Sequence, residues 1–257
     1  MRVVCVNVGA KFSDDYVNRM YLMCRRYVPF MSRFTCFTDR PRNLNAEIEQ
    51  YDCSSWGLTG WWPKLRLFDR AVLDEEFLFL DLDQILLKSM EPIYLYSQSN
   101  PEPRIIGMVD FHYKSFSSNI LWVRPSGATQ GVWDAYTEGE RFVAEGRSSG
   151  DQDFIAGYAH SRGMAHLLAT FPPEWFASYK LLRKWAHDRA KVAQLLDSAL
   201  FLVFHGRPMP HEVLQPVKSL LYLLRHRPLR AFRYWRFLED EVRSWWCLQD
   251  SNEGDHD

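Results

Sequence analysis

The stretch EFLFLDLD, residues 76–83, decides how this chain is interpreted. It begins with an apolar run of strand length and ends with one aspartate on each side of Leu82. Residues i and i+2 of a strand point the same way, so Asp81 and Asp83 are expected on one face. Two carboxylates there would repel each other without a cation, and oxygen ligands suit Mg²⁺ or Mn²⁺. The alternative for so short a motif is a solvated turn after the strand.

Apolar runs of strand length alternate with helix-like segments on both sides of this stretch. Strands are expected at 3–8, 33–37, 76–80, 105–109, 120–123 and 200–204, and helices at 14–27, 63–72, 127–145 and 152–160. This alternation is typical of an α/β fold with a largely parallel central sheet. Such sheets bind ligands beyond the carboxyl ends of their strands, where Asp81 and Asp83 are expected.

The composition excludes several classes of protein. Of the 257 residues 47% are hydrophobic, with 17 Phe, 12 Tyr and 10 Trp, which excludes disorder as the main state. The net charge of -1 argues against a nucleic-acid binder. Five cysteines without a CxxC pair predict reduced thiols in a cytoplasmic protein. The first apolar run is interrupted at Asn7, and we interpret it as a buried strand and not as a secretory signal.

The composition changes after residue 211. We expect a globular domain over 1–211, a basic and aromatic helical extension over 212–246, and an acidic tail over 247–257. Residues 216–246 carry seven Lys or Arg, three acids and seven aromatic residues, with helical spacing of the apolar positions. Such helices suit an anionic membrane surface, which predicts peripheral attachment to the inner face of a membrane. The alternative is a pair of helices that packs on the main domain.

Three more fragments carry residues of chemical interest. His205 follows an apolar run and precedes Gly206, and an imidazole is a good third ligand for Mn²⁺, although most lone histidines are structural. Asp151 follows Gly150 at the start of an expected helix, where it is either a helix cap or a site carboxylate. Lys64 follows two tryptophans and a proline. It is either a cation of the site or a surface lysine.

Taken in order, these fragments resemble those of the retaining, family-8-type glycosyltransferases of the GT-A fold, such as glycogenin and bacterial galactosyltransferases. The fragments are Pro63-Lys64-Leu65, Phe79-Leu80-Asp81-Leu82-Asp83, Phe116-Ser117-Ser118-Asn119-Ile120, Gly150-Asp151-Gln152 and Phe204-His205-Gly206-Arg207-Pro208. The resemblance implies a mixed, mostly parallel sheet flanked by helices, followed here by the helical extension. It also implies transfer of a sugar from a nucleotide sugar, usually a UDP-sugar, to a glycan, lipid-linked or protein acceptor, with retention of configuration.

The resemblance also implies a role for each matching residue. A divalent metal, Mn²⁺ or Mg²⁺, would be held against the nucleotide diphosphate by Asp81, Asp83 and His205. Lys64 would contact the phosphates or the donor sugar, and Asp151 and Gln152 would lie near the reacting anomeric carbon. The remaining donor contacts implied are Val6, Asn7 and Tyr16 at the nucleoside, Asp110 at the sugar, and Leu82, Gly206 and Arg207 beside the diphosphate.

The sequence departs from the family pattern in two places. The family stretch Phe-Asn-Ser-Gly reads Phe116-Ser117-Ser118-Asn119 here, so the amide that faces the sugar is missing or displaced. Met209 stands where the family has a lysine that closes over the diphosphate, and Arg207 is the residue able to replace it.

Two other functions are compatible with the same residues. A haloacid-dehalogenase-like phosphatase also has a DxD after an apolar strand, but normally near the N-terminus, whereas 80 residues precede the motif here. A catalytically inactive relative would bind the nucleotide sugar or a partner without transferring the sugar, and Met209 favours that alternative.

Overall fold

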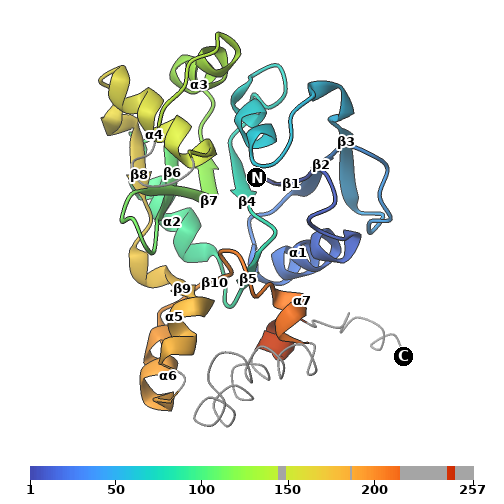
Figure 1. The fold of residues 1–257 in the computed structure, drawn as a ribbon, viewed down its shortest axis with the longest axis vertical. Helices are drawn as coiled ribbons and strands as arrows, with labels where there is room; N and C mark the ends of the chain where they lie inside the picture. Colours follow the sequence, from blue (N-terminus) through green and yellow to red (C-terminus); the bar gives the residue numbers. More distant parts are fainter. Residues whose placement is uncertain (144–148, 186, 215–241, 247–257) are drawn as a thin grey trace. The chain divides into compact units, whose positions relative to one another are not determined.

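The computed structural model describes residues 1–143, 149–185, 187–214 and 242–246. Its main element is a seven-stranded sheet in the order β3-β2-β1-β4-β7-β6-β8 (Figure 1). The strands are β1 (Arg2–Asn7), β2 (Arg33–Thr38), β3 (Ile48–Asp52), β4 (Phe77–Leu80), β6 (Ile105–Val109), β7 (Phe116–Val123) and β8 (Leu168–Thr170). A second sheet has three strands in the order β5-β10-β9.

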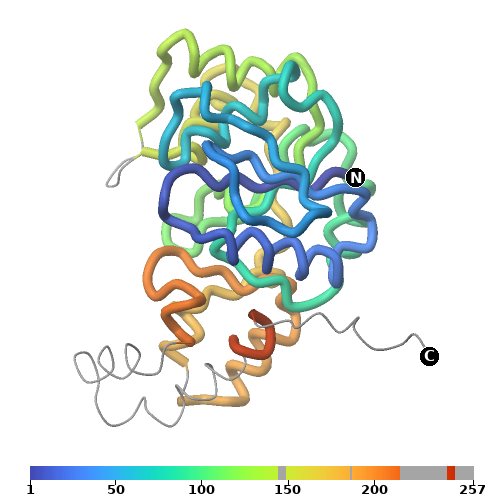
Figure 2. The backbone as a smooth tube through the Cα atoms, turned by 90° about the vertical axis from the view of Figure 1, so that its right-hand side faces the viewer, coloured from blue at the N-terminus to red at the C-terminus, as the bar shows by residue number. Residues whose placement is uncertain are grey.

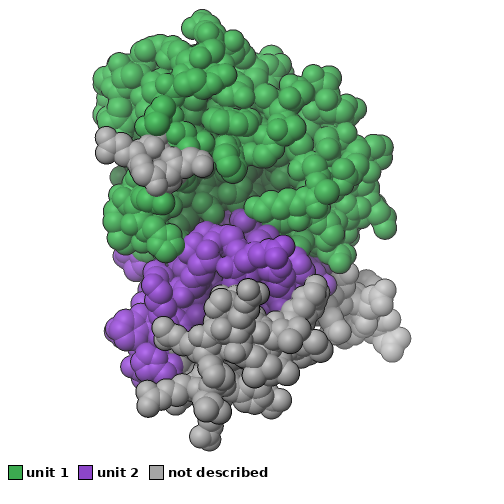
Figure 3. Space-filling view, viewed as in Figure 1, with its two compact units in different colours: residues 1–18, 30–82, 91–173 green, residues 19–29, 83–90, 174–257 purple. Residues whose placement is uncertain are grey.

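The described chain groups into two compact units, coloured separately in Figure 3. The first comprises residues 1–18, 30–82 and 91–173, and the second comprises residues 19–29, 83–90 and those from 174 onward. The division between Leu82 and Asp83 falls inside the DxD motif. Each unit is therefore described by itself.

The first unit contains the mixed, mostly parallel sheet that the sequence predicts. Strands β3, β2, β1 and β4 run parallel, β7 is antiparallel to both β4 and β6, and β8 is parallel to β6. The pairing of β4 with β7 aligns Leu80 with Ile120, and the next residue, Asp81, donates its backbone N–H to the Asn119 carbonyl at 2.9 Å. The sheet thus places the ends of β4 and β7 beside each other.

The core of the first unit lies between this sheet and the elements packed against it. These are a 3₁₀ helix, η2 (Trp62–Phe68), and two α-helices, α3 (Gly127–Thr137) and α4 (Asp151–Ser161). Pro63 suits the first turn of η2, and Ser126 begins α3 with a capping box. Buried side chains such as Phe79, Phe154 and Leu65 each contribute roughly 1.5–3 kcal/mol by leaving water.

The second unit has its own small sheet. It also contains short helices, which appear as coils of the tube in Figure 2. Its elements are β5 (Gln84–Leu86), β9 (Phe176–Ser178), β10 (Phe201–Val203), α5 (Tyr179–Lys184), α6 (Arg189–Asp197) and α7 (Pro210–Val213). Strand β10 pairs antiparallel with β5 and parallel with β9. Stacked rings support this sheet, Phe176 on Phe201 at 5.1 Å and Tyr179 on Phe204 at 4.6 Å between centroids.

Helix α1 (Asp14–Tyr27) contributes residues to both units. It begins with two aspartates and ends with two arginines, so its charges complement the helix dipole at both ends. In the second unit, Arg19 of this helix donates to the Trp246 carbonyl at 2.7 Å. Trp246 belongs to a short helical stretch, residues 242–246, in which Val242 is also buried.

All six predicted strands are present, with ends that shift by a few residues. Helices were predicted less well, because η2 ends at Phe68 and α3 already ends at Thr137. Elements not expected from the sequence are α2 (Glu91–Ser99), α5, α6, α7, β3, β5, β8 and β9. Most of the predicted extension and the whole tail lie outside the described residues. Among the described helices, none has the length and apolar character needed to span a bilayer.

Four cysteines are buried free thiols, as the sequence predicts, namely Cys5, Cys24, Cys36 and Cys53. Cys5 and Cys36 are partners in the parallel ladder of β1 and β2. Burial raises the pKa of Cys24, and burial together with the charge of Asp39 raises the pKa of Cys53 to about 12. The Cys24 and Cys53 thiols are therefore protonated and poorly reactive at neutral pH.

Candidate active site

A buried lysine joins three of the sequence fragments in the first unit. Lys64 Nζ lies 2.8 Å from Asp151 Oδ2 and 3.2 Å from each carboxylate oxygen of Asp81. It also donates to Ser118, at 3.1 Å to the carbonyl and 3.2 Å to Oγ, and Ser118 Oγ donates to Asp151. We call these four residues the Lys64 cluster.

The charge of Lys64 is maintained by its neighbours. Burial alone lowers the pKa of this lysine, but the charges and hydrogen bonds of Asp151 and Asp81 outweigh burial, so the pKa is raised. The ammonium group also lies 4.7 Å from the centre of the Phe79 ring, which adds a cation–π contact. Lys64 is therefore a permanent cation at neutral pH and not the surface lysine of the alternative interpretation.

Local structure explains how the members of the Lys64 cluster meet. Lys64 is on η2, Asp81 directly follows β4, and Ser118 lies on the neighbouring strand β7. Asp151 is the first residue of α4, where the Gly150 N–H donates to the Asp153 carboxylate at 2.9 Å. Asp153 therefore performs the capping that the sequence alternative assigned to Asp151, and Asp151 contacts Lys64 instead.

The amide of Asn119, which is displaced from its position in the family stretch, lies on the face of β7 opposite to Ser118. Asn119 Oδ1 accepts a hydrogen bond from Ser117 Oγ at 2.8 Å, whereas Ser118 joins the Lys64 cluster. Alternate residues of a strand point to opposite faces, so Ser117 and Asn119 share one face of β7 and Ser118 lies on the other, with Lys64. Ser118 is a site residue that the sequence analysis quoted but did not assign.

The second unit brings Asp83 and His205 to one end of the β5–β10 ladder. The ladder pairs Gln84 with Val203, and beyond this pair the Phe204 N–H donates to the Asp83 carbonyl at 2.9 Å. His205 Nε2 lies 2.6 Å from Ser178 Oγ, which orients the ring. Asp83 is 7% exposed, so both residues are held by buried or hydrogen-bonded surroundings.

The residues after His205 are arranged differently from the sequence expectation. The Arg207 side chain is 86% exposed, and its Nε lies 3.5 Å from Glu212 Oε1. Met209 is buried just before α7, with its N–H donating to Glu212 Oε2 at 2.9 Å. The ammonium group of Lys180, on α5, lies beside Gly206, because a Cβ added to Gly206 would be 3.4 Å from Lys180 Nζ. Lys180 is a candidate that the sequence analysis missed, because only the fold brings it beside Gly206.

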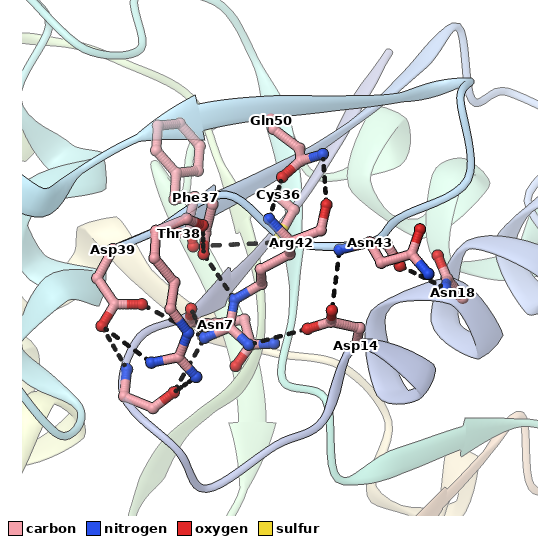
Figure 4. Close-up of polar contacts among 12 residues, drawn as sticks. Asn7, Asp14, Asn18, Cys36, Phe37, Thr38, Asp39, Arg42, Asn43 and Gln50 are labelled. Atoms are coloured by element: carbon pink, nitrogen blue, oxygen red, sulfur yellow. Dashed lines mark hydrogen bonds and ion pairs between the residues drawn. The ribbon is translucent and has the colours of Figure 1, made fainter.

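The expected nucleoside residues lie at the start of the first unit. Val6 and Asn7 end β1, and Tyr16 is buried on α1, with its ring 5.0 Å from that of Phe12. The Asn7 side chain is completely buried, and neither its Nδ2 nor its Oδ1 has a hydrogen-bond partner among the described residues. Its backbone carbonyl accepts a hydrogen bond from Arg42, the centre of the polar network in Figure 4.

Three more predicted residues, Asp110, Gln152 and Leu82, belong to the first unit. Asp110 follows β6, and its Oδ1 accepts from the backbone N–H groups of His112 at 2.7 Å and Tyr113 at 2.8 Å. Gln152 is partly exposed in the first turn of α4, and Leu82 is buried. Within the described ranges, no three His, Cys, Asp or Glu side chains gather as a metal site. The metal set of Asp81, Asp83 and His205 therefore stays a prediction.

Comparisons with known proteins were informative only at the level of structure. No family model and no curated protein sequence matches the chain. Among solved structures, the galactosyltransferase LgtC, crystallised with donor and acceptor sugar analogs, is 13% identical with a TM-score of 0.54, covering 97% of this chain and 98% of LgtC. The glycosyltransferase GlyE of Streptococcus pneumoniae TIGR4 is 13% identical with a TM-score of 0.55, covering 95% of this chain and 63% of GlyE.

A third similar structure is the bifunctional glycosyltransferase WbbM, 10% identical with a TM-score of 0.52 over 81% of this chain and 46% of WbbM. At such low identity, the agreement concerns the path of the backbone and not individual contacts. It confirms the fold that the resemblance in sequence implies. This chain has the GT-A fold of the glycosyltransferases LgtC, GlyE and WbbM.

Proposed function

We propose that the protein is a metal-dependent glycosyltransferase that takes a sugar from a UDP-sugar and transfers it, with retention, to a glycan, lipid-linked or protein acceptor. The observation that carries this proposal is the Lys64 cluster, in which a permanent cation meets Asp81 and Asp151. Departure of a nucleoside diphosphate places negative charge beside the reacting centre, and a preorganised cation stabilises that charge. A buried carboxylate such as Asp151 suits the positive charge that develops at the anomeric carbon.

The chemistry of the proposed donor set suits a divalent cation. Asp81 and Asp83 supply hard oxygen donors and His205 supplies an imidazole, a donor set that suits Mn²⁺. The main-chain bond between Phe204 and Asp83 supports this set, because it brings Asp83 and the histidine strand end together within one unit. When bound, the metal would act as a Lewis acid on the diphosphate.

The buried amide of Asn7 supports a pyrimidine nucleotide. A carboxamide can accept a hydrogen bond from the uracil N3–H and donate one to a uracil carbonyl. Asn7 has both capacities unmet among the described residues, which is unfavourable for a buried amide and is relieved by such a ligand. Tyr16, Val6 and Asp110 remain proposed donor contacts.

Two features of the proposal concern the acceptor and the location. The reduced, buried thiols support a cytoplasmic protein, and the basic, aromatic composition of residues 216–246 supports peripheral attachment to the inner face of a membrane. A lipid-linked or surface glycan acceptor would suit that location.

An inactive relative that binds the nucleotide sugar is the second candidate, and the replacement of the family lysine by the buried Met209 favours it. The phosphatase alternative has lost support, because the solved structures that resemble this chain are glycosyltransferases.

Donor hydrolysis tests the proposal without knowledge of the acceptor. UDP-glucose and UDP-galactose are incubated with the protein and Mn²⁺, and release of UDP is measured. We expect slow hydrolysis that excess chelator abolishes and Mn²⁺ restores. Asp83→Asn should lower the rate more than about 100-fold, because a charge partner of the transition state is lost. Glu102→Gln changes an exposed carboxylate and should leave the rate unchanged.

Three results would contradict the proposal in different ways. Full activity in excess chelator would exclude the metal assignment. Nucleotide-sugar binding without hydrolysis or transfer would favour the inactive relative. Cleavage of simple phosphate monoesters in preference to nucleotide sugars would restore the phosphatase.

A further inference from the structure

Asn7 raises a question of positioning, because an amide reads a base only if its orientation is fixed. Rotated by 180°, the same carboxamide presents its donor and acceptor in the reverse order, which suits cytosine better than uracil. The Asn7 side chain has no hydrogen-bond partner among the described residues to set that order. Its position must therefore come from the main chain to which it is attached.

The main chain around Asn7 is held by one buried guanidinium. Arg42 Nη2 donates to the carbonyls of Asn7 and Gly9, both at 2.9 Å, so one nitrogen binds the main chain on both sides of Val8 (Figure 4). Gly9 has a φ of +78°, a conformation that glycine adopts readily. Arg42 thus holds the turn after β1 together with Asp39, which accepts from the Gly9 N–H at 3.0 Å, and Arg40, which donates to the Gly9 carbonyl at 3.0 Å.

The Arg42 guanidinium also reaches two more segments, the end of β2 and the start of α1. Nε donates to Thr38 Oγ1 at 2.6 Å at the end of β2, Nη1 lies 3.1 Å from Asp14 at the start of α1, and Nη2 lies 3.3 Å from Asp39. The side chain is only 2% exposed, and its charge is balanced by the two carboxylates.

The backbone of Arg42 is held as firmly as its side chain. The Gln50 carboxamide accepts from the Arg42 N–H at 3.0 Å and donates to the Arg42 carbonyl at 3.1 Å. We call the set of Arg42, Asn7, Gly9, Asp14, Thr38 and Asp39 the Arg42 network.

The geometry points to Arg42 as the positioning residue of the nucleotide-base site, an inference that rests on the proposed function. Arg42 does not contact the base. It fixes the turn that carries Asn7 and so sets where the Asn7 amide meets the base, while the packing around this fully buried side chain limits the rotation of the amide. A lysine keeps the charge but offers three donors on a single atom, and it cannot reproduce a planar fork that serves several acceptors at once.

Calorimetry with UDP and CDP, each with Mn²⁺, tests this role. We expect Arg42→Lys to weaken UDP binding roughly 10- to 100-fold, the range expected for a displaced binding group, and to lower the ratio of UDP affinity to CDP affinity. Arg124→Lys is the matched control. Arg124 is also in the first unit, with a side chain that is 14% exposed, and it donates to the carbonyls of Ser97, Asn100 and Pro103. Its variant should lose stability but keep both affinities.

A double-mutant cycle separates positioning from general destabilisation. Asn7→Ala removes the group that Arg42 positions, so adding Arg42→Lys to Asn7→Ala should weaken UDP binding by less than about threefold. Asp14→Asn is a milder variant in case Arg42→Lys does not fold. It removes one charge from the Arg42 network and should weaken UDP binding in the same direction by a smaller factor.

The inference is overturned if Arg42→Lys and Arg124→Lys affect UDP binding equally, or if the two substitutions of the cycle act additively. It is also overturned if Arg42→Lys does not fold and Asp14→Asn leaves the UDP-to-CDP ratio unchanged. Failure of the proposed function has a different signature, since the parent protein would then bind no nucleoside diphosphate, and the inference falls with it.

Discussion

Lys64 shows how much a single side chain can depend on the fold around it. In the sequence it follows two tryptophans and a proline, and nothing local distinguishes it from a solvated lysine. In the structure it is buried between Asp81 and Asp151, which are 70 positions apart in the chain. Removing either the lysine or its carboxylate partners would leave an uncompensated charge in the poorly solvated interior.

Lys64→Met tests that balance. The variant keeps the length of the side chain but leaves Asp151 buried and unpaired, so we expect a loss of about 3–5 kcal/mol in the free energy of unfolding. Urea unfolding at pH 7.5 measures this loss, and Lys88→Met, at an exposed lysine, is the control.

The free energy of unfolding of the parent protein should depend on pH through Lys64. The pKa of Lys64 is raised on folding, so its contribution to stability is complete below the unfolded value near 10.4 and is lost only as the pH rises through the folded value. Equal losses for the Lys64 and Lys88 variants would show that the ion pairs contribute little.

At the scale of single elements, strand ends were easier to predict than helices. The runs at 77–80, 105–109 and 200–204 contain no polar side chain, which suits strands buried on both faces. The short strands β5, β8 and β9 have three residues each and form only by pairing with distant partners, so no local pattern indicates them. The same reason explains why Ser118 and Lys180 were not predicted as site residues.

The start of α5 provides a prediction about the diphosphate. Lys180 lies beside Gly206, whereas Arg207 is mostly exposed and near Glu212. We therefore expect Lys180→Met to weaken binding of UDP with Mn²⁺ roughly 10- to 150-fold, the equivalent of about 1.5–3 kcal/mol for a charge-assisted hydrogen bond. Arg207→Met should change it less than about threefold. If calorimetry gives the reverse order, Arg207 is the replacement for the family lysine that the sequence predicts.

At the scale of the whole molecule, the sequence predicted the fold class and the resemblance predicted the GT-A fold, both of which the structure confirms. The grouping into two units was not predictable, because each unit is assembled from separated segments. The boundary expected at residue 211 and the helical extension stay predictions, since residues 215–241 lie outside the described chain.

The buried thiols of β1 and β2 can be used to measure how often the sheet opens. Cys5 and Cys36 are partners on β1 and β2, so a thiol reagent can reach them only while those two strands separate. In a variant with Cys24 and Cys53 replaced by alanine and Cys247 by serine, the rate of reagent uptake would therefore count openings of the strand pair that carries Asn7. At UDP concentrations 100 times Kd, with Mn²⁺, labelling should slow on the order of 100-fold if opening releases the nucleotide. Uptake at the same rate with and without UDP would mean that these strands part without disturbing the bound nucleotide.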